Sequence, residues 1–296
     1  MRALAPAKVN LFLHVGPPEA NGYHPLCSLV AFADVGDQVE AEPAEALSLT
    51  MSGPFAGALA DEATDDNLVL RALRAIGAPP LRLTLDKRLP VAAGLGGGSA
   101  DAGAALRLAR EALSLPLSDA DLIAAARTVG ADGPMCLFAA PAWAEGHGER
   151  LTPEPRLPPL PAVLVNPGVP SPTGAVYQAY DESPTGSIER PSEPDDWSVG
   201  GVIGWLRQQR NDLEAPAVRL QPLIGDALAA LDVAPGVALA RMSGSGATVF
   251  GLCPSPEQAA TAAAAIRARH PGWWVEATQL GAPLDRRTEL LDASAD

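Results

Sequence analysis

The sequence of 296 residues has few cysteines and no long apolar run. Its three cysteines, Cys27, Cys136 and Cys253, lie far apart, so they predict neither a disulfide framework nor a CxxC metal site. No segment of about 18 apolar residues occurs, and no apolar signal-peptide core follows the first two residues. We therefore expect a cytoplasmic protein that is neither secreted nor embedded in a membrane.

Positive charge is also scarce. The formal net charge is −14, and the basic residues are scattered, which argues against a nucleic-acid-binding surface. An anionic ligand must therefore be held by a local site. Only two of the 21 basic residues are lysines, Lys8 and Lys87. Because Lys is a compact point charge and Arg a planar fork, these two positions are candidates for a function that needs an ammonium group.

The remaining composition is typical of a globular chain, with 47% apolar and 19% charged residues and a length that suits about two domains. The segment PEPRLPPLP at 153–161 resists both helix and internal strand because of its prolines. We therefore predict an N-terminal domain over 1–153 and a C-terminal domain over 154–296. Strands and helices mix in both halves, which predicts an α+β fold.

Alternating apolar residues predict a strand over 7–15 that carries Lys8 and Asn10 on one face. The segment MCLFAA at 135–140 is also expected to be a strand, and the segment 170–197 is expected to be a polar connection. Short β-prone runs predict a meandering sheet, at 28–35, 38–42 and 47–51.

The most informative segment is the glycine cluster within KRLPVAAGLGGGSADAGAA at 87–105. Its glycines run into a predicted helix whose N-cap is Ser99 and whose first turn holds Asp101, which complements the helix dipole. Glycine permits positive φ and close approach of a ligand, and a helix N-terminus offers free N–H groups. The spacing fits neither GxxxxGK[ST] nor GxGxxG. The segment predicts a phosphate cradle, and the alternative is a flexible surface loop.

Three segments together resemble the GHMP kinase family. They are PAKVNLFLHV near the start, PVAAGLGGGSADAGAA in the middle and SGSGATVFGL near the end. One group of enzymes within this family shares five more segments, NGYHPL, DDNLVLRAL, DKRLP, GADGPMC and AEGHGERLTP. The resemblance therefore covers almost the whole chain.

The resemblance implies a two-domain GHMP kinase fold, with an N-terminal half like domain 2 of ribosomal protein S5 and a ferredoxin-like C-terminal half. It also implies a kinase that uses ATP and Mg²⁺ and acts as a monomer or weak homodimer. The expected reaction is phosphorylation of the 2-hydroxyl of a small-molecule cytidine diphosphate substrate in the non-mevalonate route to isoprenoid precursors. No family-like carboxylate for Mg²⁺ emerges, so the metal ligands stay unassigned.

The resemblance assigns catalytic roles to Lys8 and Asp132. Asp132, expected in a loop just after a helix, corresponds to the base that accepts the proton of the attacking hydroxyl, and Lys8 orients it and offsets negative charge. The resemblance also implies that one segment, together with Asn67 and Lys87, binds ATP. The residues of that segment are Val91, Ala92, Ala93, Gly94, Leu95, Gly96, Gly97, Gly98, Ser99, Ala100 and Asp101.

Three residues are expected to hold the cytidine. Tyr23 would stack on the base, His24 would hydrogen-bond to its edge, and Tyr177 would lie on the other side. Further expected substrate contacts are Asn10, Ser245, Gly246 and Thr248. Tyr177, Ala100 and Gly133 depart from the family pattern, and Gly133 is expected to loosen the loop of the catalytic aspartate.

Two alternatives remain open. A sister kinase acting on mevalonate, homoserine or another small alcohol would share the glycine loop but lack the pocket of Tyr23 and His24. A non-catalytic nucleotide-binding module would keep the fold without the reaction, although the presence of Lys8 and Asp132 argues against it.

Overall fold

The computed structural model describes residues 1–59, 67–184 and 187–281. The strands are β1 (Arg2–Val15), β2 (Leu26–Pro43), β3 (Ser48–Ser52), β4 (Leu81–Asp86), β5 (Ala142–Gly146), β6 (Arg150–Pro153), β7 (Leu160–Asn166), β8 (Leu239–Met242), β9 (Val249–Leu252) and β10 (Trp274–Leu280). The α-helices are α1 (Leu68–Ala75), α2 (Gly97–Ala112), α3 (Asp119–Arg127), α4 (Gly133–Phe138), α5 (Thr173–Asp181), α6 (Val199–Leu206), α7 (Glu214–Leu220), α8 (Pro222–Asp232) and α9 (Pro256–Arg269). None of the helices within these ranges is long and apolar enough to cross a membrane.

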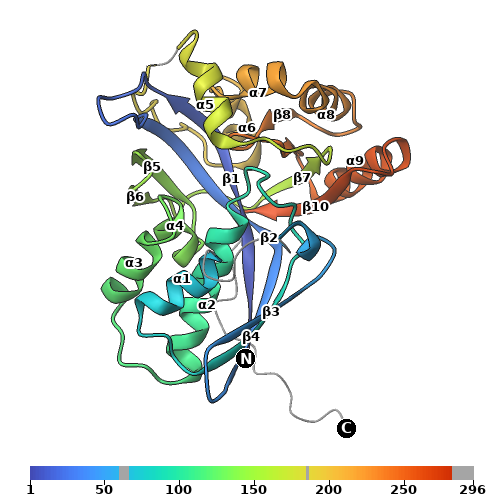
Figure 1. The fold of residues 1–296 in the computed structure, drawn as a ribbon. Helices are drawn as coiled ribbons and strands as arrows, with labels where there is room; N and C mark the ends of the chain where they lie inside the picture. Colours follow the sequence, from blue (N-terminus) through green and yellow to red (C-terminus); the bar gives the residue numbers. More distant parts are fainter. Residues whose placement is uncertain (60–66, 185–186, 282–296) are drawn as a thin grey trace.

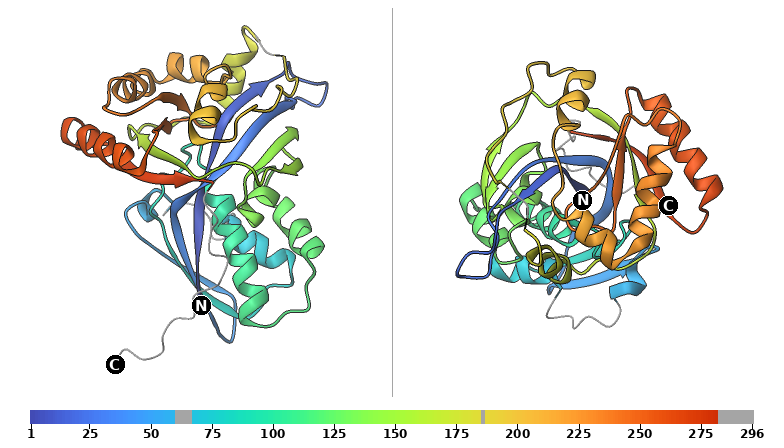
Figure 2. Two further views of the ribbon diagram at one scale, coloured as in Figure 1. Left: turned by 180° about the vertical axis from the view of Figure 1, so that it is seen from behind. Right: turned by 90° about the horizontal axis from the view of Figure 1, so that it is seen from above.

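Strands β1 and β2 pair antiparallel and run through both lobes of the molecule (Figures 1 and 2). Helices α1 to α4 cover the lower lobe in Figure 1, whereas α5 to α9 surround the upper lobe. The sheet has the order β3-β4-β2-β10-β7-β9-β8, with β1 and β5 also paired to β2 and β6 paired to β5. The two lobes therefore share one strand system.

Strand β1 is confirmed, and it extends further than the alternation predicts. Both of its faces are covered from Ala5 to Val15, so even the polar residues of this stretch are buried. Its register with β2 shifts between Pro6 and Lys8 and again between Asn10 and Phe12. Such irregularities bend a strand and re-aim its side chains. They flank the two polar residues that the alternation places on one face.

The predicted meander is wrong in its first part, because 28–35 and 38–42 belong to the single 18-residue strand β2. The apparent break contains Gly36, where a Cβ atom would lie 2.1 Å from the carbonyl oxygen of Ala5. The glycine therefore permits close pairing of β1 and β2 and does not interrupt the strand. Strand β3 then pairs parallel to β4 instead of continuing a meander.

Two further predictions are wrong for a common reason. MCLFAA lies largely in α4, a short buried helix with Pro134 in its first turn, and proline suits that position. The supposed connection at 170–197 contains α5, whose buried residues include Val176, Ala179 and Tyr180. Both helices are short, six and nine residues, so neither shows an apolar period over several turns.

Small residues bring α2 and α4 together in the lower lobe. Alanines of α2 are fully buried in the core beneath it, and a Cβ atom on Gly103 would lie 2.9 Å from the carbonyl oxygen of Cys136. The backbones of the two helices are therefore in close contact. This packing places the residue that precedes α4 beside the start of α2.

Candidate active site

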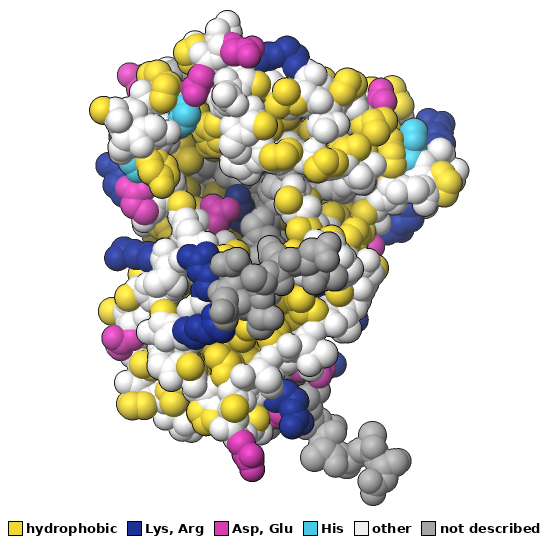
Figure 3. All heavy atoms as spheres, in the orientation of Figure 1, with side chains coloured by type: hydrophobic (Ala, Val, Ile, Leu, Met, Phe, Trp, Pro, Cys, Tyr) yellow, Lys and Arg dark blue, Asp and Glu magenta, His cyan; other side chains and the backbone are white. Residues whose placement is uncertain are grey.

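A cleft of about 500 Å³ lies where the glycine loop, β1, α4 and α5 meet. Figure 3 shows it as a hollow between the two lobes. Most of the predicted phosphate-binding segment lines this cleft, as do Lys8, Asn10, Asn67, Lys87 and Asp132. Leu95 and Ala100 do not, because both side chains are buried in the core. The sequence prediction and the cleft therefore agree in most of the loop.

The glycine loop leads into an uncapped helix. Gly94 and Gly96 have φ angles of 73° and 62°, values that favour glycine. Helix α2 begins at Gly97 with Gly96 as its N-cap, so the predicted N-cap at Ser99 is wrong by three residues. Among the described residues, no side chain caps the first turn. Its first N–H groups therefore lie at the cleft without a capping partner from the described chain, an arrangement that favours an anion.

The SGSG turn at 243–246 supports the glycine loop from behind. A Cβ atom on Gly94 would lie 2.4 Å from the carbonyl oxygen of Ser243, and Ser243 Oγ donates a 3.0 Å hydrogen bond to the Gly94 carbonyl. Ser245 lines the cleft and exchanges a 2.9 Å hydrogen bond with Thr173. Thr248 is instead fully buried and accepts a 3.0 Å hydrogen bond from Asn166. Thr248 thus lies behind the cleft, away from its surface.

Gly246 also lies outside the cleft lining. A Cβ atom there would lie 2.7 Å from the sulfur of Met242 and 3.3 Å from Ser171 Oγ. The residue therefore belongs to the packed base of the SGSG turn. Of the predicted contacts in this turn, Ser245 is the one whose position suits a ligand, and the neighbouring Gly244 lines the cleft beside it.

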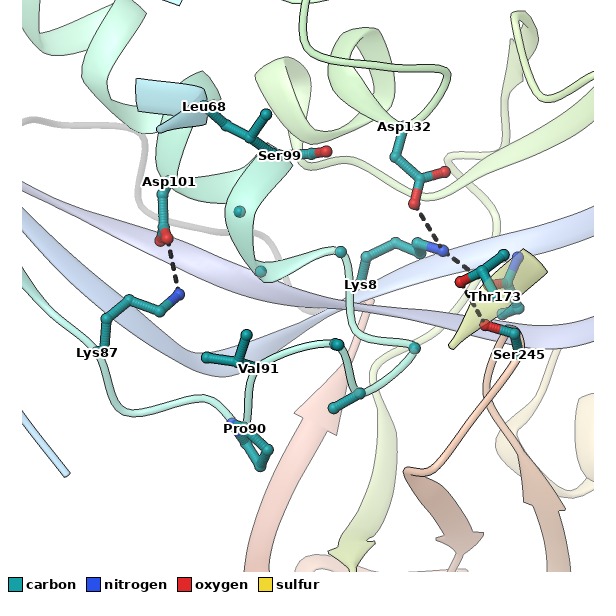
Figure 4. Close-up of a pocket in the computed structure, with 18 of the residues that line it drawn as sticks. Lys8, Leu68, Lys87, Pro90, Val91, Ser99, Asp101, Asp132, Thr173 and Ser245 are labelled. Carbon is teal, nitrogen blue, oxygen red and sulfur yellow. Dashed lines mark hydrogen bonds and ion pairs between the residues drawn. The ribbon is translucent and has the colours of Figure 1, made fainter. Parts of the chain in front are cut away.

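Lys8 and Asp132 come from opposite walls of the cleft and point toward each other (Figure 4). Lys8 Nζ lies 3.1 Å from Asp132 Oδ2 and donates a 2.9 Å hydrogen bond to Asn10 Oδ1. Asn10 in turn donates a 2.8 Å hydrogen bond to Ser28. The Lys8 side chain is 7% exposed and that of Asp132 39%. The ammonium is thus held in place, while the carboxylate faces open space.

Asp132 is positioned by a tight backbone contact. It is the N-cap residue of α4, not part of a free loop, and its side chain makes no capping hydrogen bond. A Cβ atom on Gly133 would lie 1.9 Å from the carbonyl oxygen of Ala126 in α3. The expected loosening by Gly133 is therefore wrong, because glycine here lets α3 and α4 pack in direct backbone contact. The carboxylate is left free for Lys8.

Tyr177 lines the same cleft from α5. Burial, and next the charge of Asp132, raise the pKa of its phenol to about 12, so it is a neutral hydroxyl at physiological pH. Burial is also the main cause of the raised pKa of the Cys136 thiol, which removes this cysteine as a nucleophile.

Lys87 lies between two buried carboxylates. Its Nζ contacts Asp37 and lies 2.7 Å from Asp101 Oδ2. Asp37 Oδ1 also accepts hydrogen bonds from the backbone N–H groups of Arg88, at 2.6 Å, and Leu89, at 2.8 Å. The prediction that Asp101 serves the helix dipole is thus wrong, because its carboxylate pairs with Lys87. The ammonium of Lys87 ties β2, the end of β4 and the start of α2 together.

The charges of this cluster do not balance if both carboxylates are ionised. Burial raises the pKa of Asp101 to about 8, although Lys87 acts in the opposite direction. Among the described residues, Asp101 Oδ1 has no hydrogen-bond partner. The raised pKa favours a proton on Asp101 and a single ion pair in the interior, which lowers the cost of burial.

Of the three residues expected to hold cytidine, Tyr177 lines the cleft, whereas Tyr23 and His24 lie outside its lining. The His24 ring is 4.8 Å from the Tyr177 ring, centroid to centroid, and His24 Nε2 is 2.7 Å from Asp181 Oδ1. Tyr23 is 64% exposed and lies 5.4 Å from the His147 ring. Sequence reasoning missed Asp181, which is 157 residues away from its partner.

The described residues contain no cluster of three or more His, Cys, Asp or Glu side chains suited to a metal ion. Oxygen donors are nevertheless present at the phosphate end of the cleft, because Ser99 extends its hydroxyl from the first turn of α2 (Figure 4). Mg²⁺ often takes few protein ligands and completes its shell with phosphate oxygens and water. The site therefore fits a Mg²⁺ ion that is bound mainly through a nucleotide.

Comparisons with known proteins agree over nearly the whole chain. The model of the GHMP kinases N terminal domain matches residues 67–140, and that of GHMP kinases C terminal matches residues 203–272. A curated 4-diphosphocytidyl-2-C-methyl-D-erythritol kinase from Caulobacter sp. (strain K31) is 55% identical over 290 residues, covering 95% of this chain and 98% of the relative. One from Hyphomonas neptunium (strain ATCC 15444) is 51% identical, covering 94% and 96%.

Solved structures give the same picture. A crystal structure of 4-(cytidine 5'-diphospho)-2C-methyl-D-erythritol kinase matches with a TM-score of 0.75 and 38% identity, covering 95% of this chain and 99% of its own. The L. major mevalonate kinase, solved with R-mevalonate, matches with a TM-score of 0.66 at 14% identity, covering 95% of each chain. At that identity the second likeness concerns the fold alone.

Proposed function

The chain belongs to the GHMP kinase family, and from this premise we propose that it transfers the terminal phosphoryl group of ATP to the 2-hydroxyl of 4-diphosphocytidyl-2-C-methyl-D-erythritol. Curated relatives of that name are more than half identical to it over nearly their full length. The observation that carries the proposal is the 3.1 Å pair of Lys8 and Asp132 in the cleft that the uncapped start of α2 also faces. One site thus joins a phosphate cradle to an acid-base pair.

The phosphate cradle is assigned to the first turn of α2. The N–H groups of Gly97, Gly98 and Ser99 would bind the phosphates of ATP, with the positive end of the helix dipole behind them. Ser99 would add its hydroxyl and would also serve as a protein ligand of Mg²⁺. When bound, Mg²⁺ supplies positive charge that neutralises the phosphate oxygens. The remaining chemistry falls to Lys8 and Asp132.

Asp132 is proposed as the base. Its carboxylate would accept the proton of the substrate hydroxyl as the new oxygen–phosphorus bond forms and the bond to the ADP oxygen breaks. Lys8, held by Asn10 at 2.9 Å, would orient the carboxylate and would offset charge on the transferred group. Proton, phosphoryl group and ADP are then all accounted for. The exposure of Asp132 leaves room for the incoming hydroxyl.

The cytidine end is proposed to involve Tyr23, His24 and Tyr177. The ring contact between His24 and Tyr177 places a polar edge beside an aromatic face, and Tyr177 continues into the cleft. The exposed ring of Tyr23 is available to stack on a base. Asn10, Ser245, Asn67 and the glycine loop would complete the contacts between the two ends.

The domain division at 153/154 also stays part of the proposal. Strand β6 ends at Pro153 and β7 begins at Leu160, so the boundary falls in a short segment between the two. A cytoplasmic location, the absence of nucleic-acid partners and a monomer or weak homodimer are proposed with it. The buried, widely separated cysteines of the described chain suit a reducing compartment.

A substrate panel tests the proposal. Purified protein with ATP and Mg²⁺ is assayed for ADP release with the cytidine diphosphate alcohol, with mevalonate, with homoserine and with no acceptor. We expect release with the first alone, and ³¹P NMR should show a new phosphomonoester beside an intact diphosphate. Efficient phosphorylation of mevalonate or homoserine, with the cytidine compound untouched, would refute it. ATP binding without acceptor-dependent ADP release would favour the non-catalytic alternative.

A further inference from the structure

His24 has an acidic partner that sequence reasoning did not supply. Its Nε2 lies 2.7 Å from Asp181 Oδ1, and the side chains are 7% and 36% exposed. Asp181 is the last residue of α5, where the negative end of the helix dipole disfavours a carboxylate. A carboxylate in this position therefore has no local benefit from its own helix. Its hydrogen bond to His24 accounts for its presence.

Resting on the proposed function, we infer that Asp181 is a positioning residue that fixes the tautomer of His24 and so makes the site select cytosine over uracil. The Asp181 oxygen accepts a hydrogen bond from Nε2–H, and an imidazole that carries its single proton on Nε2 has none on Nδ1. Nδ1 then carries a lone pair and acts as an acceptor. A histidine without such a partner is free to exchange the two tautomers.

The lone pair on Nδ1 distinguishes the two pyrimidines by their chemistry at position 4. Cytosine carries an amino group there, which donates a hydrogen bond, whereas uracil, like thymine, carries a carbonyl oxygen, which accepts one. An amino group satisfies Nδ1. The carbonyl oxygen of uracil would instead place its lone pair against the lone pair of Nδ1, so neither atom would have a hydrogen-bond partner. A buried polar group without a partner is costly.

The surrounding contacts hold the pair in place. Tyr180 donates a 2.5 Å hydrogen bond to the carbonyl oxygen of Val15, which fastens α5 to β1. The His24 ring packs 4.8 Å from Tyr177 and 6.0 Å from Tyr180. Within the described part of the chain, Nε2 is the ring nitrogen of His24 that is hydrogen-bonded, and no residue there pairs with Nδ1. Nδ1 is therefore the ring nitrogen that remains for a ligand.

Asp181→Ala, with Asp181→Glu as the conservative variant, tests this inference. Each protein is assayed with the cytidine diphosphate alcohol and with its uridine counterpart. We expect Asp181→Ala to raise KM for the cytidine compound about tenfold, to affect kcat much less, and to lower the preference for cytidine over uridine about tenfold. Asp181→Glu should restore part of the preference. Glu182→Ala, which removes the adjacent exposed carboxylate, should match the wild type.

The tautomer is read directly by ¹⁵N NMR of the imidazole in the protein without substrate. The wild type should show the proton on Nε2, and Asp181→Ala should show a mixture. A proton on Nδ1 in the wild type would overturn the inference, as would an unchanged cytidine preference in Asp181→Ala. Lack of any activity with the cytidine compound would instead refute the proposed function, and the NMR result would still decide the role of Asp181.

Discussion

The two lysines of the chain occupy opposite environments within one cleft. Lys8 has a single carboxylate partner, Asp132, which is 39% exposed, and a neutral amide, Asn10. Lys87 has two carboxylate partners, Asp37 and Asp101, and all three side chains are buried. The carboxylate of the first pair is open to the cleft on one side, whereas the side chains of the second cluster are almost fully buried.

This difference separates two uses of one residue type. The carboxylate beside Lys8 can take a proton from a ligand, because one face of it is free. The ammonium of Lys87 is saturated by its partners, and its task is to hold three elements together at the start of α2. Lys87 was predicted beside ATP, and it does line the cleft, but its contacts favour a positioning role behind the glycine loop. The pair proposed for the reaction thus lines the same cleft as Lys87 and Asp101, which position the start of α2.

The largest expected effect comes from breaking the open pair. Asp132→Asn removes the proton acceptor but leaves the glycine loop intact, so kcat should fall by about 10²- to 10⁴-fold. The affinity for ATP should stay nearly unchanged. Steady-state kinetics and calorimetric titration with an ATP analogue measure the two quantities. Near-normal turnover would remove Asp132 from the role of base.

A smaller effect is expected from the backbone that positions the open pair. Gly133→Ala forces α4 away from Ala126, because the new Cβ would overlap its carbonyl oxygen. We expect a loss of about 1–3 kcal/mol in the free energy of unfolding, measured by urea denaturation, together with lower kcat. Gly204→Ala, in α6 with open space around it, is the matched control and should be neutral or stabilising. Equal behaviour of the two variants would contradict the packing argument.

The smallest expected effect concerns the protonation of the buried cluster of Lys87, Asp37 and Asp101. Since the pKa of Asp101 is raised to about 8 in the folded protein and lies near 4 in an unfolded chain, the folded state binds more protons between these values. The free energy of unfolding should therefore fall as the pH rises from about 4 toward 8. Asp101→Asn, which mimics the protonated acid, should flatten this dependence. Parallel stability curves for the two proteins would contradict the raised pKa of Asp101.

Local signals in the sequence predicted the elements that depend on them. Asn67 caps α1, and Ser118 and Asp121 form a capping box before α3; such motifs can be recognised in a sequence because they involve residues within a turn of one another. In contrast, α4 and α5 were missed, since tertiary burial stabilises them. The break read at Gly36 was wrong for the same reason, because only the approach of a second strand explains that glycine.

The candidate site shows the same limit. Period-2 alternation places Lys8 and Asn10 on one face, and they do hydrogen-bond. Their meeting with Asp132 was expected from the family resemblance, because nothing local to residues 8 and 132 encodes their distance. The contact between Lys87 and Asp101 depends on the path of the chain from the end of β4 to the start of α2. The contact between His24 and Asp181 depends on how α5 packs against the rest of the fold. Such contacts follow from topology and were not visible in the sequence pattern.

Methionine variants of the two lysines, measured side by side, test the central contrast most directly. Met keeps much of the length of Lys without its charge. Lys8→Met should lower kcat at least about 100-fold and leave the melting temperature within a few degrees of the wild type. Lys87→Met should leave the buried carboxylate of Asp37 without its cation and cost about 3–5 kcal/mol of stability. A folded, fully stable Lys87→Met protein, or a Lys8→Met enzyme with normal turnover, would contradict the account.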